Sequence, residues 1–251
     1  ARAAGGMVLI ASGALPTRRT TPPAAVWRDE AMKATDGVAN GEGAKRYSHT
    51  LDTIGWYGRS PADLHLVARA FRLFGTEAPV AKSVGALRIG LCRGPHWAVA
   101  APESQEAVLT AAKRLEAAGA VVEELVLPDA FDEISRAHHI VLHGEGRGAF
   151  LQEFLTAPGL LHQDFHDRAL NKEGITARDM VWAYDHASAC RRLFDAVFPG
   201  YDAVLTPAAA GEAPVGRQDT GNPIFNSMWT LLHVPCIGIR RAAIVRSSRS
   251  T

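Results

Sequence analysis

The 251-residue chain carries 27 Lys and Arg residues against 26 Asp and Glu residues, so its formal net charge is +1. This balance excludes a strong field that would attract nucleic acid or an anionic membrane. With 47% hydrophobic and 21% charged residues, the chain has the composition of a soluble globular protein with a sizeable core. Its apolar runs are too short for a membrane span, and glycines interrupt the one near the N-terminus, so we also expect no signal peptide.

The three cysteines are far apart in the sequence. Cys92, Cys190 and Cys236 form no CxxC pair, which argues against a cysteine zinc site and against a disulfide framework. Each lies in an apolar stretch, which is typical of a buried thiol. Free buried thiols favour a cytoplasmic location.

A capped helix is predicted to begin at Ser60. The Ser60 side chain can accept a hydrogen bond at the helix start, Pro61 suits the first turn, and Asp63 favours the positive helix end. Apolar residues then recur at helical spacing as far as Phe74. Gly75 predicts the end of this helix.

The next segment predicts a strand, a helix and a second strand. Leu87, Ile89 and Leu91 alternate with less apolar residues, which is a strand pattern. Residues 102–118 show helical spacing, and the stretch AVVEELVLP that follows is typical of a strand. Such a unit normally has parallel strands joined by a right-handed crossover.

The second half of the chain predicts further alternation of helices and short strands. Residues 130–156 look helical but contain Gly144, Gly146 and Gly148, which are expected to interrupt the helix, and residues 157–175 look irregular. The remaining predicted elements are a long helix opened by a Thr176–Asp179 capping box, a strand in YDAVLTP, a helix over about 224–232 and a last strand in VPCIGI. The fold class is therefore α/β, a mixed β-sheet flanked by helices.

Four residues form the densest group of metal-ligand types: His138, His139, His143 and Glu145. His139 and His143 are four apart and would share one face of a helix. The HExxH pattern is absent, and glycines flank Glu145. We therefore expect no metal, while a metal hydrolase that uses His139 and His143 stays an alternative.

The segment after YDAVLTP is the candidate substrate-binding region. A strand end followed by a polar loop is where α/β sheets commonly bind ligands. Amide, indole and apolar groups at Phe225, Asn226 and Trp229 suit a small polar substrate with an apolar side chain. The alternative is that Asn222 caps the short helix and Trp229 packs in the core.

Several phrases resemble one family of enzymes. The stretch YSHTLDTIGWYGRSPADLHLVARAF is similar to the segment that follows the signature region of the amidase signature family. AMKATDG resembles the family's Lys-Pro-Thr-x-Gly turn, with Ala34 in place of Pro. FPGYDAVLTPAAAGEAP and NPIFNSMWTLLHVPCIGI are similar to later family segments and follow in the same order. The resemblance covers residues 31–239 and implies a partial amidase-signature fold in a single domain, with residues 1–30 and 240–251 atypical.

The resemblance implies hydrolysis of a small-molecule amide by a Ser–Ser–Lys triad, without a metal or an organic cofactor. The sequence contains neither the Gly-Ser-Ser-Gly-Gly nor the Gly-Gly-Ser loop of that triad, so no catalytic residue is assigned. The resemblance places the nucleophile at about residues 17–26, where TRRTTPPAAV stands. Our hypothesis is that residues 16–30 and 240–251 were translated out of the ancestral frame.

Two expectations follow for the polypeptide as a whole. We predict that it has no amidase activity, and the alternative is a non-catalytic small-molecule binding or structural α/β protein on the same scaffold. We also expect an unpaired sheet edge and exposed apolar helix faces, which favour a partner such as a second copy in a homodimer.

Overall fold

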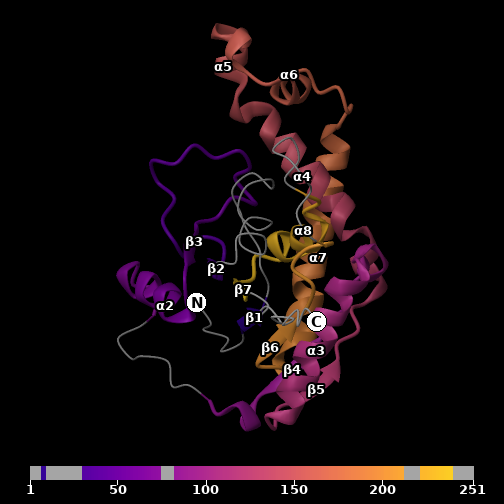
Figure 1. The fold of residues 1–251 in the computed structure, drawn as a ribbon. Helices are drawn as coiled ribbons and strands as arrows, with labels where there is room; N and C mark the ends of the chain where they lie inside the picture. Colours follow the sequence, from indigo (N-terminus) through magenta and orange to yellow (C-terminus); the bar gives the residue numbers. More distant parts are fainter. Residues whose placement is uncertain (1–6, 10–29, 75–81, 212–220, 240–251) are drawn as a thin grey trace, which may run out of the picture.

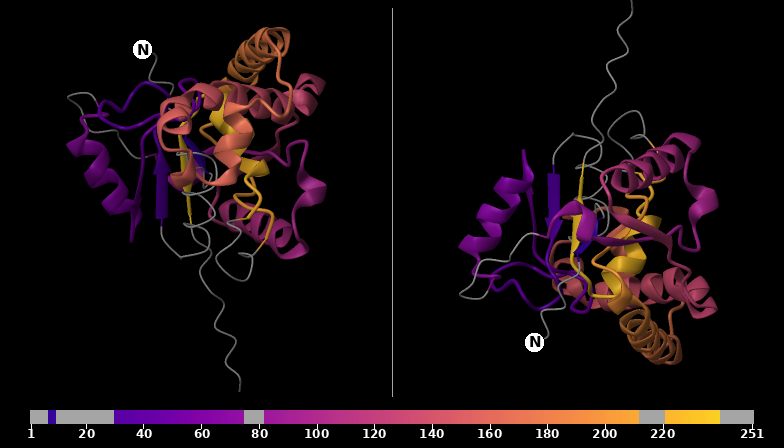
Figure 2. Two further views of the ribbon diagram at one scale, coloured as in Figure 1. Left: turned by 90° about the horizontal axis from the view of Figure 1, so that it is seen from above. Right: turned by 90° about the horizontal axis from the view of Figure 1, so that it is seen from below.

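The computed structural model describes residues 7–9, 30–74, 82–211 and 221–239. In these residues a seven-stranded sheet has the order β3-β2-β7-β1-β6-β4-β5. Figure 1 shows α2 beside β2 and β3, and Figure 2 shows that α2 lies across the strands from α4 and α7. The predicted α/β class, a mixed sheet flanked by helices, is confirmed.

The bounds of the elements are as follows. The strands are β1 (Met7–Leu9), β2 (Glu30–Lys33), β3 (Gly55–Gly58), β4 (Arg88–Leu91), β5 (Val121–Glu124), β6 (Ala203–Leu205) and β7 (Cys236–Gly238). The α-helices are α2 (Pro61–Ala70), α3 (Pro102–Ala117), α4 (Ile134–Ala149), α5 (Leu151–Thr156), α6 (Gln163–Ala169), α7 (Ala177–Val197) and α8 (Ile224–Leu231).

The sheet is parallel in its centre and antiparallel at one side. β4 pairs in parallel with both β5 and β6, and β1 pairs in parallel with β6 and β7. The predicted unit of β4, α3 and β5 is therefore confirmed. β2 runs antiparallel to β7 and β3, and neither β2 nor β3 was predicted as a strand. One reason is Gly55. A Cβ at this position would lie 2.9 Å from the Met32 carbonyl oxygen, so the close approach of β3 to β2 requires glycine. Glycine has a low strand propensity, so the sequence pattern does not indicate a strand here.

Helix α2 begins as predicted but ends early. The Asp63 N–H donates to the Ser60 side chain at 3.3 Å. Arg72 has φ of 56°, and the Leu73 N–H donates to the Ala68 carbonyl at 3.0 Å. This backbone turn satisfies the last carbonyls of the helix. The prediction that the helix continues to Gly75 is therefore wrong, and Gly75 itself lies outside the described residues.

The capping box of α7 is confirmed. The Thr176 side chain accepts from the Asp179 N–H, and the Asp179 carboxylate accepts from the Thr176 N–H. The helix buries a stripe of Ala183, Ala187, Cys190 and Phe194, as its spacing predicts. Residues 157–175 were expected to be irregular, but they contain α6.

The glycines of α4 do not interrupt the helix, contrary to the prediction. α4 continues through all three of them, and the break falls at Phe150. A Cβ at Gly146 would lie 2.1 Å from Tyr47 Cζ, and one at Gly144 would lie 2.1 Å from Met180 Sδ. Both glycines therefore permit neighbouring side chains to contact the helix backbone, and this packing outweighs their low helix propensity.

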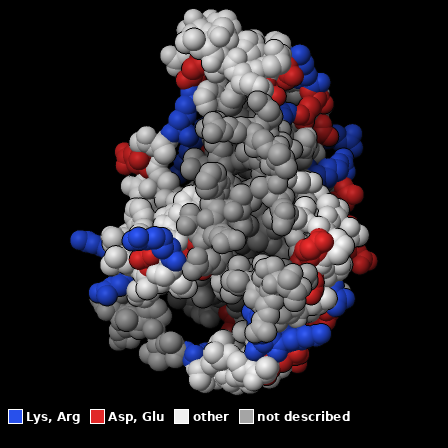
Figure 3. All heavy atoms as spheres, viewed as in Figure 1, with Lys and Arg blue, Asp and Glu red and all other residues white. Residues whose placement is uncertain are grey.

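The buried apolar residues form three clusters. The largest joins α4, α7 and α8, a second lies between α3 and the β4–β6 side of the sheet, and a third lies under α2. On the face shown in Figure 3, basic and acidic side chains are interspersed, in keeping with the balanced charge. Within the described ranges, none of the helices combines the length and the apolar character needed to cross a bilayer.

The close approach at Gly146 predicts a sharp contrast between two glycines of one helix. Gly146→Ala should reduce the free energy of unfolding by about 2–3 kcal/mol, because the buried Tyr47 ring must move. Gly148→Ala should raise it by up to about 1 kcal/mol, because nothing lies within 4 Å of its Cβ position and alanine is the better helix former. Urea denaturation of both variants checks this, and equal effects would contradict it.

Candidate functional site

The candidate site lies at the carboxyl ends of two neighbouring parallel strands. β4 and β6 end side by side, with Leu91 opposite Leu205. Ligands of α/β sheets commonly bind at this edge. A small pocket of about 10 Å³, enough for roughly one water, lies there. Its lining residues are Arg93, Gly94, Pro95, His96, Thr206, Ile224, Phe225, Met228 and Trp229.

The structure brings two of the three predicted substrate-binding residues to this pocket. Phe225 and Trp229 line it, although Trp229 is fully buried and also packs edge-on against Phe194 with ring centroids 5.7 Å apart. Asn226 is not among the lining residues, and its Nδ2 donates to the Ala208 carbonyl at 3.1 Å. The N-cap residue of α8 is Pro223, and the Asn222 side chain, one residue earlier, accepts from the Ile224 N–H at 3.0 Å. Substrate binding by Phe225, Asn226 and Trp229 stays a prediction.

Two buried polar atoms of α8 have unmet hydrogen-bonding capacity. Within the described ranges, neither Asn226 Oδ1 nor Trp229 Nε1 has a hydrogen-bond partner. Buried polar groups are nearly always paired, so each such atom needs an explanation. The two residues are three apart on the helix and therefore lie on neighbouring turns of the same face. One is an acceptor and the other a donor, the complement of an amide N–H and an amide carbonyl.

A chain of three side chains beside the pocket was not predicted. His96 Nε2 lies 2.6 Å from Ser135 Oγ, and Ser135 Oγ lies 3.5 Å from Ser227 Oγ. Burial lowers the pKa of His96, against an opposing effect of Asp132, and this favours the neutral ring. A neutral histidine that contacts a serine hydroxyl can act as its base. Nothing in the sequence marks these residues, because they come from three distant segments.

Lys33 is the most buried cation of the described residues, with an exposed fraction of 1%. Its Nζ donates to the Val234 carbonyl at 2.5 Å and to the Ala34 carbonyl at 3.3 Å. Burial lowers its pKa, although Cys236 and Asp36 oppose the effect. Lys33, on β2, thus holds the segment that leads into β7 beside β2. Among the described residues, no serine side chain is its hydrogen-bond partner.

The predicted histidine and glutamate cluster is divided between two faces of α4. His138 points into the core, where burial lowers its pKa to about 3. Glu145 is held by the segment that precedes β3, because Ser48 Oγ donates to its carboxylate at 2.5 Å and the Thr50 N–H donates at 2.9 Å. The Tyr184 hydroxyl donates to the same carboxylate at 2.7 Å. His139 and His143 lie close together, but Glu145 does not join them.

The cysteines do not offer a nucleophile. All three are free and buried, as predicted. Burial raises the pKa of Cys92 to about 12, and it also raises the pKa of Cys190. A thiol acts as a nucleophile through its thiolate, so Cys92 and Cys190 are unreactive at neutral pH.

Residues 32–239 match the family model described as Amidase. The chain belongs to the amidase family. The resemblance drawn from the sequence is therefore confirmed. A curated relative, the 2-amino-5-chloromuconic acid deaminase of Comamonas testosteroni, is 30% identical over 235 residues, which cover 87% of this chain and 49% of the relative.

Solved structures of amidases share the fold. A crystal structure of an amidase has a TM-score of 0.76 and 19% identity, with 93% of this chain and 55% of that chain covered. Fatty acid amide hydrolase has a TM-score of 0.66 and 16% identity, with 86% and 41% covered. The chain thus spans about half the length of the relatives that it matches. The predicted position of the amidase nucleophile, about residues 17–26, lies outside the described residues.

The bonds to Glu145 predict a pH-dependent contribution to stability. Burial alone would raise the pKa of Glu145, but hydrogen bonds from Ser48, Thr50 and Tyr184 outweigh it and lower the pKa below 4.5. Because the folded-state pKa is lowered, the stabilisation is fully present above pH 4.5 and is lost as the pH falls through the folded-state value. Glu145→Gln should therefore cost about 1–2 kcal/mol at pH 7 and progressively less at lower pH.

Urea denaturation at pH 7 and at pH 3.5 measures this difference (roughly one pH unit below the usual glutamate pKa). Glu116→Gln on the exposed side of α3 is the matched control, and it should change the free energy of unfolding little at either pH. A cost for Glu145→Gln that is equal at both pH values would contradict the assignment.

Proposed function

We propose that the chain is part of an amide-bond hydrolase and supplies a wall of its substrate pocket. The observation that carries the proposal is the amidase match over residues 32–239, which includes every segment that lines the pocket. The relative from Comamonas testosteroni is named a deaminase, and release of ammonia from a carbon–nitrogen bond is common to deamination and to hydrolysis of a primary amide.

The proposed substrate is a small amide with an apolar side chain. In the pocket, Phe225 and Met228 offer apolar contact and Trp229 offers an unmet donor. Asn226, on the same face of α8 but not a lining residue, has the unmet acceptor that would complete the complement of an amide group. The pocket holds about one water, so binding requires these side chains to move. Met228 is suited to such movement because its side chain is unbranched and flexible.

We further propose that these 251 residues do not turn over amides by themselves, because the sequence contains neither Gly/Ser loop of the amidase triad. The chemistry proposed uses no metal and no organic cofactor. We also propose that the chain acts on small molecules rather than nucleic acid, forms a homodimer and resides in the cytoplasm. Its balanced charge and its buried free cysteines support the first and the last of these.

The second candidate is a non-catalytic protein that binds small molecules in the same pocket. The observation that favours it is that the chain keeps the segments that line the pocket while its sequence contains neither Gly/Ser loop of the triad. The two candidates differ in what the encoding DNA holds. If the amidase proposal is right, a shifted reading frame around codons 16–30 should encode a Gly-Gly-Ser motif, and one beyond codon 239 should encode a family-like C-terminus. Frames and flanks without such motifs would favour the binding protein.

The pocket assignment predicts binding without turnover. Primary amides from acetamide to benzamide should shift the NMR signals of the chain, and Phe225→Ala should weaken that binding at least about fivefold, because a buried aromatic contact is worth about 1 kcal/mol or more. Phe71→Ala, on the exposed part of the α2 end, is the matched control and should leave binding unchanged. Equal losses in the two variants would contradict the pocket.

Turnover is measured in the same samples. We expect ammonia release no greater than in buffer alone, and no serine labelled by a fluorophosphonate in mass spectra of the protein. Labelling of Ser135 would instead show that the pair with His96 is a working nucleophile and base, and it would overturn the proposal that this chain is inactive.

A further inference from the structure

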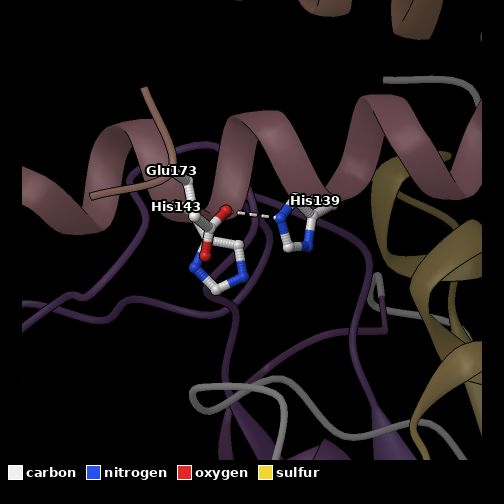
Figure 4. Close-up of side chains that lie close together, drawn as sticks. All are labelled: His139, His143 and Glu173. Carbon is white, nitrogen blue, oxygen red and sulfur yellow. Dashed lines mark hydrogen bonds and ion pairs between the residues drawn. The ribbon is translucent and has the colours of Figure 1, made fainter. Parts of the chain in front are cut away.

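Three side chains outside the pocket gather on the outer side of α4. His139 and His143 project from one helix face, and Glu173 reaches them from the turn between α6 and α7, as Figure 4 shows. One ligand atom of each residue lies within 4.8 Å of the others. His139 Nε2 and Glu173 Oε2 are 2.6 Å apart, and the two imidazole centroids are 4.1 Å apart.

We propose that His139, His143 and Glu173 bind a divalent transition-metal ion such as Zn²⁺. Two imidazoles and one carboxylate are a ligand set that Zn²⁺ prefers, whereas Mg²⁺ and Ca²⁺ prefer oxygen ligands alone. Histidines four apart on a helix present their rings to the same ion. The sequence led us to expect no metal, because the HExxH pattern is absent and glycines flank Glu145. The carboxylate comes instead from Glu173.

The geometry requires only a small adjustment to admit the ion. Bonds of about 2.0–2.1 Å at tetrahedral angles place two ligand atoms roughly 3.4 Å apart. His139 Nε2 and Glu173 Oε2 must therefore separate by less than about 1 Å from their present 2.6 Å. The ligand atoms lie within 4.8 Å of one another, so the most distant pair must approach by up to about 1.4 Å. The ion replaces the proton that these atoms share, and the side chains are 54% and 37% exposed, so the ion has access from solvent.

Glu173 is positioned by contacts that do not involve the histidines. The Arg168 guanidinium pairs with Glu173 Oε1 and leaves Oε2 facing His139. The turn that carries Glu173 is closed by Asn171, whose side chain accepts from the Ile175 N–H at 3.1 Å and donates to the Ile175 carbonyl at 3.0 Å. Outer contacts of this kind orient metal ligands and raise affinity. The positive charge of Arg168 acts in the opposite direction and limits the affinity.

The expected role of the ion is to join two elements. Three protein ligands leave at least one position for water, but none of the three residues lines the pocket. An ion held there connects the α6–α7 turn to α4. Because it binds only the folded chain, it should raise the midpoint of thermal unfolding by an amount that grows with the logarithm of its concentration relative to the dissociation constant.

Isothermal titration of the full 251-residue chain, stripped with chelator, tests the site with ZnCl₂. One ion per chain is expected, and Zn²⁺ should raise the melting temperature. His143→Ala and Glu173→Gln should each weaken binding at least about tenfold. His65→Ala, on the exposed side of α2, is the matched control and should bind Zn²⁺ as the unaltered chain does.

Several results would overturn the proposal. These are the absence of saturable binding at millimolar Zn²⁺, unchanged binding in His143→Ala and Glu173→Gln, or an equal loss in His65→Ala. If His143→Ala fails to fold by circular dichroism, His139→Ala takes its place, because that side chain is 54% exposed. Substitution of Co²⁺ provides a second readout. A visible absorption band that disappears in His139→Ala supports imidazole ligation, and a band that persists contradicts it.

Discussion

The contact between α4 and the segment before β3 is the constraint on which the rest of the structure depends. Tyr47 lies against the backbone of α4 at Gly146, and one residue earlier Glu145 binds Ser48 and Thr50. Because glycine permits the close approach and the carboxylate fixes its register, the β2–β3 side of the sheet is tied to the helical layer. α4 in turn packs on α7 and α8, and these three helices together carry most of the largest core cluster.

This packing places the first turn of α4 at the candidate pocket. Ser135 lies there, in contact with His96 from the loop after β4 and within 3.5 Å of Ser227 on α8. Each residue comes from a different element, so their meeting depends on the position of α4 rather than on local sequence. The same helix presents His139 and His143 to Glu173 further along its length. One helix therefore positions both groups of side chains.

Local signals predicted the helix starts and several strands, and contacts between distant segments decided the sites. The capping residues of α2 and α7 act within four residues, so the sequence alone revealed both helix starts. The glycines of α4 led to a wrong prediction because the side chains that pack against them, Tyr47 and Met180, lie far away in sequence. The pairing of β2 with β3 and the meeting of Glu173 with His139 were hidden for the same reason.

The proposed pocket and the proposed position of the nucleophile lie in separate segments of the chain. The pocket is built from residues after β4, after β6 and on α8, all of which the chain retains. β1 lies beside β6 in the middle of the sheet, and Leu9 ends opposite Leu205, next to the pocket residue Thr206. The family resemblance places the nucleophile in the segment that follows β1. A change confined to that segment would remove the chemistry and leave the pocket intact, because the β4–β6 pair and α8 are held by contacts of their own.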